Sequence, residues 1–213
     1  MVLSRIYTRT GDDGSTSLGD MSRTVKTDPR LVAYADVDEA NAAIGVAVTC
    51  GDLPEAVRAL LTRVQNDLFD VGADLCTPLS PSYAHPPLRV HDAWIDELEL
   101  ACDTFGEPLE TLRSFVLPGG TPGSAFLHVA RTVTRRAERA TWAAIARYGT
   151  DDEGGINPLT ARYLNRLSDL LFVLGRVANQ GRGGDVLWVP GGGRQAAPGQ
   201  PTADDAGQAV VPT

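Results

Sequence analysis

Apolar residues recur every three or four positions over five stretches of the chain, which is the spacing of an amphipathic α-helix. Four of these stretches begin just after a proline, at Pro29, Pro54, Pro122 and Pro158, where a residue without an amide donor suits a helix start. The predicted helices cover residues 31–48, 55–75, 90–105, 123–148 and 159–179. The pattern predicts an all-α fold: a five-helix bundle with a four-helix up-and-down core and one extra helix.

Evidence for β-strands is thin. Residues 4–10 alternate briefly, and the apolar run VLWVP at 186–190 has no strand partner in the surrounding sequence. After Pro190 the chain is rich in Gly, Pro, Ala and Gln and too poor in large apolar residues to offset the entropy of ordering. We therefore divide the chain into a helical-bundle domain over 1–190 and a disordered tail over 191–213.

Composition narrows the range of partners. The 213 residues carry 19 Lys and Arg against 27 Asp and Glu, a net charge of −8, which excludes nucleic acid and anionic membranes as default partners. Cys50, Cys76 and Cys102 are too widely spaced for a zinc ligand pair and odd in number, so no disulfide framework is predicted. With no apolar signal segment and no membrane-length apolar run, we expect a cytoplasmic protein.

The first candidate binding segment lies near the N-terminus. Two glycines free the backbone to turn its N–H groups inward, and hydroxyl and cationic side chains surround them, which suits a polyphosphate. The residues concerned are Thr8, Arg9, Thr10, Gly11, Thr16, Ser17 and Lys26. The alternative is an ordinary Gly/Asp turn before the first helix, since neither a Walker A loop nor a GxGxxG pattern is present.

The second candidate is the run RTVTRRAER in the longest predicted helix. Arg131, Arg135 and Glu138 share one face with His128 and could project together into a groove. The alternative is a solvated face held by ion pairs. Because Asp38 lies beside the apolar stripe of the first helix and a carboxylate near a core needs a cation, we expect it to pair with an arginine of this run.

Three weaker signals remain. Asn165, with Ser168 and Asp169, forms a polar strip that could bind a ligand or satisfy a neighbouring backbone group. The segment FVLPGG at 115–120 indicates a tight turn. A carboxylate series at helical spacing lacks the Glu-x-x-His pairs of a di-iron site and is interpreted as solvated surface; it consists of Asp67, Asp70 and Asp74.

Five segments, taken in order, closely resemble the PduO-type ATP:cob(I)alamin adenosyltransferases. They are IYTRTGDDGSTSL, YADVDEANAAIG, FVLPGG, FLHVARTVTRRAER and YLNRLSDLLF, and the match runs from about Ile6 to Ala178. The resemblance implies a five-helix homotrimer with ATP bound between adjacent subunits. It also implies transfer of the 5′-deoxyadenosyl group of ATP to cob(I)alamin, forming adenosylcobalamin and releasing tripolyphosphate.

The resemblance assigns roles residue by residue. The nucleotide loop falls on Thr8, Arg9, Thr10 and Gly11, with Thr16, Ser17 and Lys26 on the phosphate side. The second nucleotide segment falls on Arg135, Arg136, Glu138 and Arg139, with Asn165 from the last helix. Asp38 and Arg131 match a salt pair between subunits that orders the site, Phe115 matches the aromatic residue against the corrin, and Phe172 lines the same pocket.

The implied chemistry explains why the sequence contains no recognisable catalytic triad or general base. Cob(I)alamin is already a strong nucleophile, so no Ser-His-Asp set or general base is needed. The protein must align cobalt with the ribose and neutralise a triphosphate leaving group beside Mg²⁺, which Arg131 and Arg135 would help to do. The implied cofactors are ATP, Mg²⁺ and cobalamin, with a reductase and an adenosylcobalamin-dependent mutase as partners. The rival functions are a non-catalytic nucleotide or corrinoid carrier and a ligand-free helical adaptor.

Overall fold

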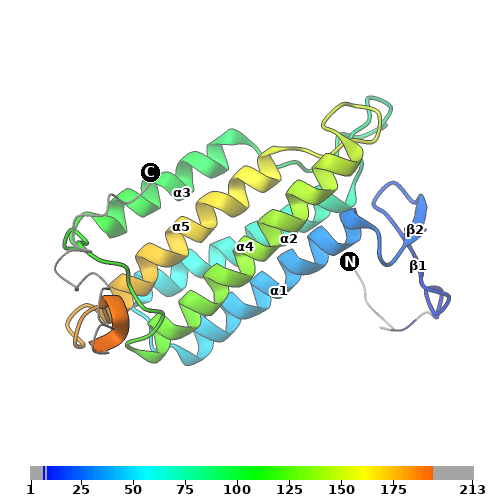
Figure 1. Ribbon diagram of the computed structural model, residues 1–213. Helices are drawn as coiled ribbons and strands as arrows, with labels where there is room; N and C mark the ends of the chain where they lie inside the picture. The colour runs from blue at the N-terminus through cyan, green and yellow to red at the C-terminus, as the bar shows by residue number, and fades with distance from the viewer. Residues whose placement is uncertain (1–6, 8, 194–213) are drawn as a thin grey trace, which may run out of the picture.

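Five helices dominate the computed structural model, which describes Tyr7 and residues 9–193. They are α1 (Pro29–Cys50), α2 (Glu55–Cys76), α3 (Asp92–Gly106), α4 (Pro122–Tyr148) and α5 (Leu159–Asn179) (Figure 1). The five-helix prediction is thus confirmed, with ends close to those expected. Thr8 and residues 194–213, most of the predicted tail, lie outside the described residues. Within the described residues, no helix combines the length and apolar content needed to cross a membrane.

Local sequence explains where α1 and α4 begin. The Asp28 carboxylate accepts the Arg30 backbone N–H at 2.8 Å, and the Thr121 hydroxyl accepts that of Ser124 at 3.2 Å. Each cap is followed by a proline in the first turn of its helix, where no donor is needed. Short-range signals therefore fix the N-terminal ends of α1 and α4, the two central helices.

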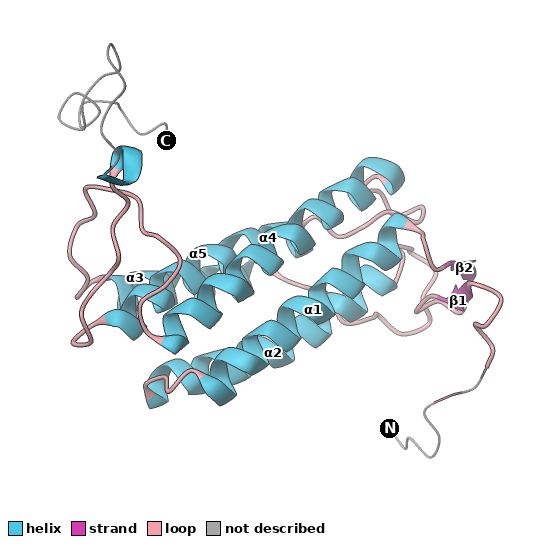
Figure 2. Cartoon of the chain, turned by 60° about the horizontal axis from the view of Figure 1, so that its bottom comes forward, coloured by secondary structure: helices cyan, strands magenta, loops and turns pink. Residues whose placement is uncertain are grey.

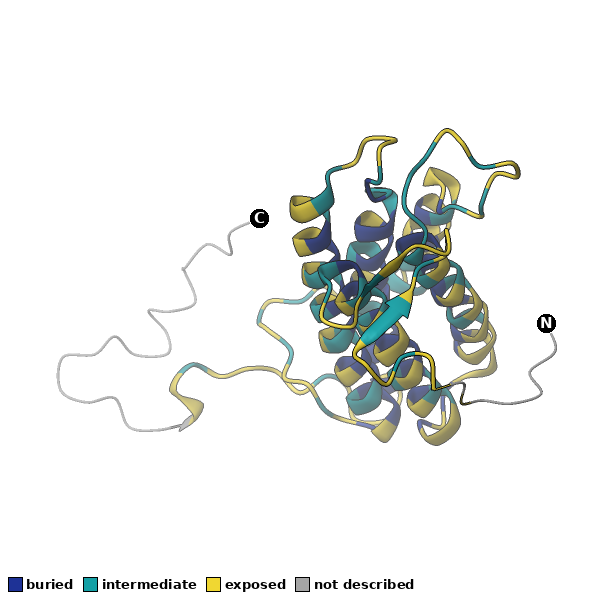
Figure 3. Cartoon of the chain, turned by 90° about the vertical axis from the view of Figure 1, so that its right-hand side faces the viewer, coloured by how far each residue is buried: buried dark blue, intermediate teal, exposed yellow. Residues whose placement is uncertain are grey.

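Four of the helices, α2, α1, α4 and α5, form a closed bundle in which α2 also contacts α5. α1 packs between α2 and α4, α4 packs between α1 and α5, and α3 lies on α5 as the extra helix (Figures 1 and 2). α1 buries alanine at every seventh position, at Ala33, Ala40 and Ala47, and α4 buries a matching series at 130, 137 and 144. Such small-residue stripes allow close approach of the two helix backbones. Buried positions line the interior and exposed ones the outside of the bundle (Figure 3).

Two small β features were not expected from the sequence. Strands β1 (Ser15–Ser17) and β2 (Arg23–Val25) form an antiparallel hairpin at one end of the bundle (Figure 2). At the other end, Val116 pairs with Leu187, so the expectation that the run 186–190 lacks a partner is wrong. The partner lies about 70 residues earlier in the chain, beyond the reach of any local hairpin signal.

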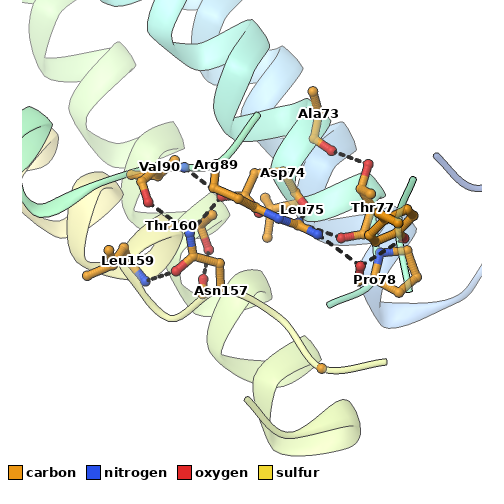
Figure 4. Close-up of polar contacts among 12 residues, drawn as sticks. Ala73, Asp74, Leu75, Thr77, Pro78, Arg89, Val90, Asn157, Leu159 and Thr160 are labelled. Atoms are coloured by element: carbon orange, nitrogen blue, oxygen red, sulfur yellow. Dashed lines mark hydrogen bonds and ion pairs between the residues drawn. The ribbon is translucent and has the colours of Figure 1, made fainter. Parts of the chain in front are cut away.

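Asp74 is a second correction. It was predicted to lie on solvated surface, but it is 1% exposed and is covered by the segment before α3 and the start of α5. Its carboxylate accepts the Arg89 guanidinium at 2.6 Å, the Val90 backbone N–H at 2.8 Å and the Asn157 amide at 2.7 Å (Figure 4). A buried carboxylate needs such compensation. Asp74 therefore joins three segments of the chain instead of facing water.

Candidate functional site

The N-terminal hairpin brings most of the predicted polyphosphate residues into one loop. Gly11 leaves room for Lys26: a Cβ at Gly11 would lie 3.2 Å from the lysine Nζ and 2.8 Å from the Ser15 carbonyl oxygen. The Lys26 backbone N–H donates to the Gly14 carbonyl at 2.8 Å, which closes the loop. Thr16 and Ser17 belong to β1, where Thr16 pairs with Thr24.

Arginines also shape this loop. Arg23, which the sequence reading missed, donates to the Thr10 carbonyl at 3.1 Å and to the Ser15 hydroxyl, so it ties the two sides of the hairpin together. Arg9 lies 5.9 Å from the Tyr7 ring and has a left-handed backbone with φ of 63°, which is uncommon for a residue with a side chain. Thr8, between them, lies outside the described residues.

Arg131 and Arg135 form a cationic face on α4. Among the described residues neither forms an ion pair with a carboxylate. Burial, and next the positive charge of Arg135, lower the pKa of Arg131. Arg139, one turn further on, donates to the Arg135 carbonyl at 3.2 Å. A half-buried arginine beside a second arginine, with no counter-charge from the described part of its own chain, favours binding of an anion.

Arg136 differs from its neighbours. It forms an ion pair with Glu39 and approaches the Asp36 carboxylate at 3.7 Å, both on α1. The alternative interpretation of RTVTRRAER, a face held by ion pairs, therefore applies to Arg136 and not to Arg131 or Arg135. In one chain, the charge of Arg136 is largely used in joining α1 to α4.

Glu138 and Asn165 meet between α4 and α5. The Asn165 amide donates to the Glu138 carboxylate at 3.2 Å beside a cavity of about 300 Å³, which Trp142 and Arg162 also line. The rest of the predicted polar strip is occupied within α5: the Ser168 hydroxyl donates to the Asn165 carbonyl, and Asp169 pairs with Arg166. Asn165 is thus the member of the strip that reaches the arginine helix.

Aromatic residues form two separate pairs. Phe115 meets Trp188 edge-to-face at 5.9 Å, with 61% and 43% of the two residues exposed. Backbone bonds align them, because the Trp188 N–H donates to the Phe115 carbonyl at 2.8 Å. Phe172 instead packs against His128 at 6.0 Å, inside the α4–α5 contact. The sequence reading gave no role to Trp188; its backbone and ring contacts with Phe115 are the signal that it lacked.

Asn179, at the end of α5, holds the turn that follows Phe115. Its side-chain oxygen accepts the Thr121 backbone N–H at 2.9 Å, and its amide donates to the Gly119 carbonyl and the Asp185 carboxylate, each at 3.2 Å. Gly120 has φ of 99°, and a Cβ there would lie 2.3 Å from the Asn179 oxygen. Gly120 therefore leaves room for Asn179, which fixes both the segment after Phe115 and the segment before Trp188.

Asp38 is exposed on α1 and has no ion pair among the described residues, which differs from the expectation of a pair near the core. It lines a groove of about 450 Å³ between α1 and α2, together with Phe69, which is 71% exposed. Arg131, on α4, lies on the side of the bundle where His128 meets α5. The two residues therefore do not meet within one chain.

The predicted site is spread along the bundle. The hairpin adjoins the start of α1, where the Tyr148 hydroxyl at the end of α4 donates to Asp28 at 2.5 Å. Arg135 precedes Tyr148 by thirteen residues, which is about 20 Å of helix. The segments that carry Phe115 and Trp188 lie beyond it, at the opposite end from the hairpin (Figure 1). One chain thus supplies three separate groups of candidate residues.

Comparisons with known proteins agree on one family. The family described as cobalamin adenosyltransferase matches residues 6–178. A corrinoid adenosyltransferase from Mycobacterium tuberculosis is 60% identical over 195 residues, covering 92% of this chain and 98% of that protein. The corrinoid adenosyltransferase PduO of Salmonella typhimurium is 40% identical over 172 residues, covering 80% of this chain and 48% of that protein.

The structural comparison leads to the same group. A variant PduO-type ATP:corrinoid adenosyltransferase from Lactobacillus reuteri, solved in complex with cobalamin and ATP, has a TM-score of 0.77 and 34% identity. The alignment covers 86% of this chain and 96% of that one. A second variant of the same enzyme, complexed with ATP, has a TM-score of 0.74.

Proposed function

This chain belongs to the cobalamin adenosyltransferase family as a PduO-type enzyme that uses ATP to adenosylate a corrinoid, and we propose how its residues divide that reaction. The cobalt of cob(I)alamin supplies both electrons of the new Co–C bond to the ribose C5′. The C5′–O bond breaks, and its electron pair leaves with tripolyphosphate. No proton has to be removed from the nucleophile, so the protein's contributions are alignment and charge neutralisation.

The observation that carries this proposal is the charge of Arg131 and Arg135, which has no carboxylate partner among the described residues. Arg135 is exposed one turn after Arg131, so a triphosphate can reach and neutralise this local positive charge. We assign the phosphates to Arg135 and Arg139 on one side and to the hairpin on the other. The N-terminal residues that we assign to the phosphates are Thr8, Arg9, Thr10, Gly11, Thr16, Ser17 and Lys26.

The same proposal places the site between subunits of a homotrimer. Two observations support it: the hairpin and Arg135 lie in separate parts of one bundle, and, among the described residues, Asp38 has no cation partner and Arg131 has no carboxylate partner. We propose that Asp38 of one subunit pairs with Arg131 of the next. The second nucleotide segment then faces the neighbour's hairpin and consists of Arg135, Arg136, Glu138 and Arg139, with Asn165.

The corrinoid is assigned to the aromatic side of the site. Phe115 is exposed in the chain alone, and a large apolar ligand would cover it. In this proposal Phe115 contacts the corrin and Phe172 supports the same wall from α5. An apolar wall on the lower face keeps water off the cobalt, which favours its reduced state.

Further parts of the proposal concern partners and location. Within the described residues, no cluster of three or more His, Cys, Asp or Glu side chains is arranged to hold a metal ion. We therefore propose that Mg²⁺ enters with the triphosphate. In this proposal a reductase supplies the reduced corrinoid, and an adenosylcobalamin-dependent mutase consumes the product. The enzyme works in the cytoplasm, and residues 1–190 form its catalytic domain.

One assay tests the reaction directly. Protein, MgATP and chemically reduced cobalamin should give the absorption spectrum of adenosylcobalamin together with tripolyphosphate, and with more than one turnover per site. Release of ADP or pyrophosphate would contradict the mechanism. A single turnover would indicate a carrier instead of an enzyme. A ligand-free adaptor would show no thermal shift with MgATP, whereas saturation at about 100 times Kd should stabilise a true binder by about 2.7 kcal/mol.

A further inference from the structure

His128 occupies a closed position between α4 and α5. It is 2% exposed. Its ring meets Phe172 edge-to-face at 6.0 Å and lies over Gly175, where a Cβ would be 3.4 Å from its Nε2. Its Nδ1 accepts the Nε–H of Arg131 at 3.3 Å. The imidazole is therefore packed on α5 and bonded to the arginine of the proposed site.

The other ring nitrogen of His128 is unusual. Because Nδ1 accepts a hydrogen bond, the neutral ring carries its proton on Nε2. That N–H is buried and has no partner among the residues that the structure describes. An unpaired buried donor is unfavourable, and an apolar side chain of similar size would avoid it. Stability alone therefore does not explain a histidine here, whereas its bond to Arg131 does.

The bond restricts Arg131. An arginine has five N–H groups, and His128 takes the one on Nε. The four N–H groups on the two Nη atoms have no hydrogen-bond partner among the described residues, and the nearby Arg135 repels them. Fixing Nε fixes the plane of the guanidinium, so both Nη atoms are presented together to an anion.

We propose that His128 is a positioning residue for adenosyl transfer, which holds the Arg131 guanidinium in the orientation that the shared site requires. This rests on the proposed function, because it assigns a task to Arg131. His128 itself touches neither substrate. Its effect should therefore depend entirely on Arg131.

Protonation of His128 would abolish this effect. The imidazolium carries a hydrogen on Nδ1, so it cannot accept from Arg131 and it repels the guanidinium. Burial, and then the Arg131 charge, lower the pKa of His128, against the attraction of Asp185 beyond α5. From α5 the ring meets Phe172 and Gly175, which carry no charge. The histidine is thus neutral at neutral pH, and positioning is lost as the pH falls through its lowered pKa.

The test compares amides that mimic different ring nitrogens. The Asn oxygen can reach the place of Nδ1, whereas Gln extends to the place of Nε2. We expect His128→Leu to lower kcat/KM for ATP roughly 10- to 100-fold, because a hydrogen bond to a charged group is lost. His128→Asn should restore most of this and should remove the acid-side fall of the pH profile, whereas His128→Gln should not restore activity. The melting temperature of His128→Leu should not fall, because this variant removes an unpaired buried donor.

Ser124→Ala is the matched control, because Ser124 is buried one turn earlier, its hydroxyl has no hydrogen-bond partner among the described residues, and it is not bonded to Arg131. It should retain wild-type activity. In an Arg131→Ala background, His128→Leu should have no further effect. If His128→Leu is as active as wild type while Arg131→Ala is impaired, or if Asn and Gln behave alike, the positioning role is wrong and the proposed function stands. If Arg131→Ala is also fully active, the proposed assignment of Arg131 to the shared site fails, and the positioning role of His128 fails with it, although the adenosyltransferase activity stands.

Discussion

Arginines that look alike in the sequence have different tasks in the structure. Arg136 is neutralised by Glu39 and Asp36 of α1, whereas Arg131 and Arg135 have no carboxylate partner among the described residues. Helical spacing alone could not separate them, because the carboxylates come from a helix about 100 residues away in the chain. The distinction makes the unpaired arginines the best positions at which to test phosphate binding.

Replacing Arg135 should abolish most turnover without unfolding the protein. Arg135 is exposed, so Arg135→Ala removes no packing. Losing one group that neutralises charge in the transition state costs about 10²–10³-fold in kcat. Steady-state kinetics and a thermal melt check both parts. Arg58→Ala, which removes an exposed arginine paired with Glu55, is the control and should remain fully active. Wild-type turnover in Arg135→Ala would remove Arg135 from the site.

Replacing Phe115 should weaken the reaction with the corrinoid and leave ATP binding unchanged. Phe115→Ala removes a large exposed apolar side chain that packs on Trp188, in a segment at the opposite end of the bundle from the hairpin (Figure 1). Losing such a contact with the corrin costs about 1.5–3 kcal/mol, or roughly 10- to 100-fold in corrinoid affinity or turnover. ATP affinity, measured by calorimetry, should be unchanged.

Leu100→Ala is the control for Phe115→Ala, because Leu100 is an equally exposed apolar residue, placed on α3. It should affect neither substrate. Equal losses of ATP and corrinoid binding in Phe115→Ala would show that the turn itself had collapsed.

Among the secondary-structure elements, those that depend on local signals could be predicted from the sequence. The helices follow from apolar periodicity and from caps such as Asp28 and Thr121, which act within four residues. The hairpin β1–β2 escaped prediction because its strands have three residues each and almost no apolar alternation. The pairing of Val116 with Leu187 and the burial of Asp74 escaped because distant segments cause them.

The Asp74 junction should govern the stability of the bundle end near the hairpin. Asp74→Ala removes one acceptor each from the Arg89 guanidinium, the Val90 N–H and the Asn157 amide, and it leaves the Arg89 charge without its carboxylate. Breaking a buried pair in this way costs about 3–5 kcal/mol, measured by urea unfolding. Asp70→Ala, one turn earlier on α2 and only partly buried, should change stability by less than about 0.5 kcal/mol. Similar stabilities of the two variants would show that the junction contributes little.

At the scale of the whole molecule, the net charge of −8 conceals a local positive field. Lys26 on the hairpin and Arg131 and Arg135 on α4 can act on one anion only if they come together. They lie in separate parts of one chain, and the Asp38 groove between α1 and α2 exposes an apolar residue, Phe69. The arrangement in one chain therefore favours a site completed by a second copy.

Mixed assemblies can test this sharing of the site. Asp38→Ala and Arg131→Ala should each be nearly inactive as pure proteins, because every interface then lacks one member of the proposed pair. Co-expression with two different tags and isolation through both tags would give trimers that contain both variants. In a cyclic trimer, each such assembly has a single interface with an intact Asp38 from one subunit and an intact Arg131 from the next, so activity should return to about one third of wild type.

The matched control carries both tags on Asp38→Ala alone and should stay inactive, because none of its interfaces is intact. Light scattering would confirm that all samples have the mass of a trimer, so that lost assembly is not mistaken for a lost site. If the mixed trimers are no more active than the parents, Asp38 and Arg131 do not complement each other across an interface, and each active site must be built differently. Recovery to about one third would instead require that neighbouring subunits each supply one half.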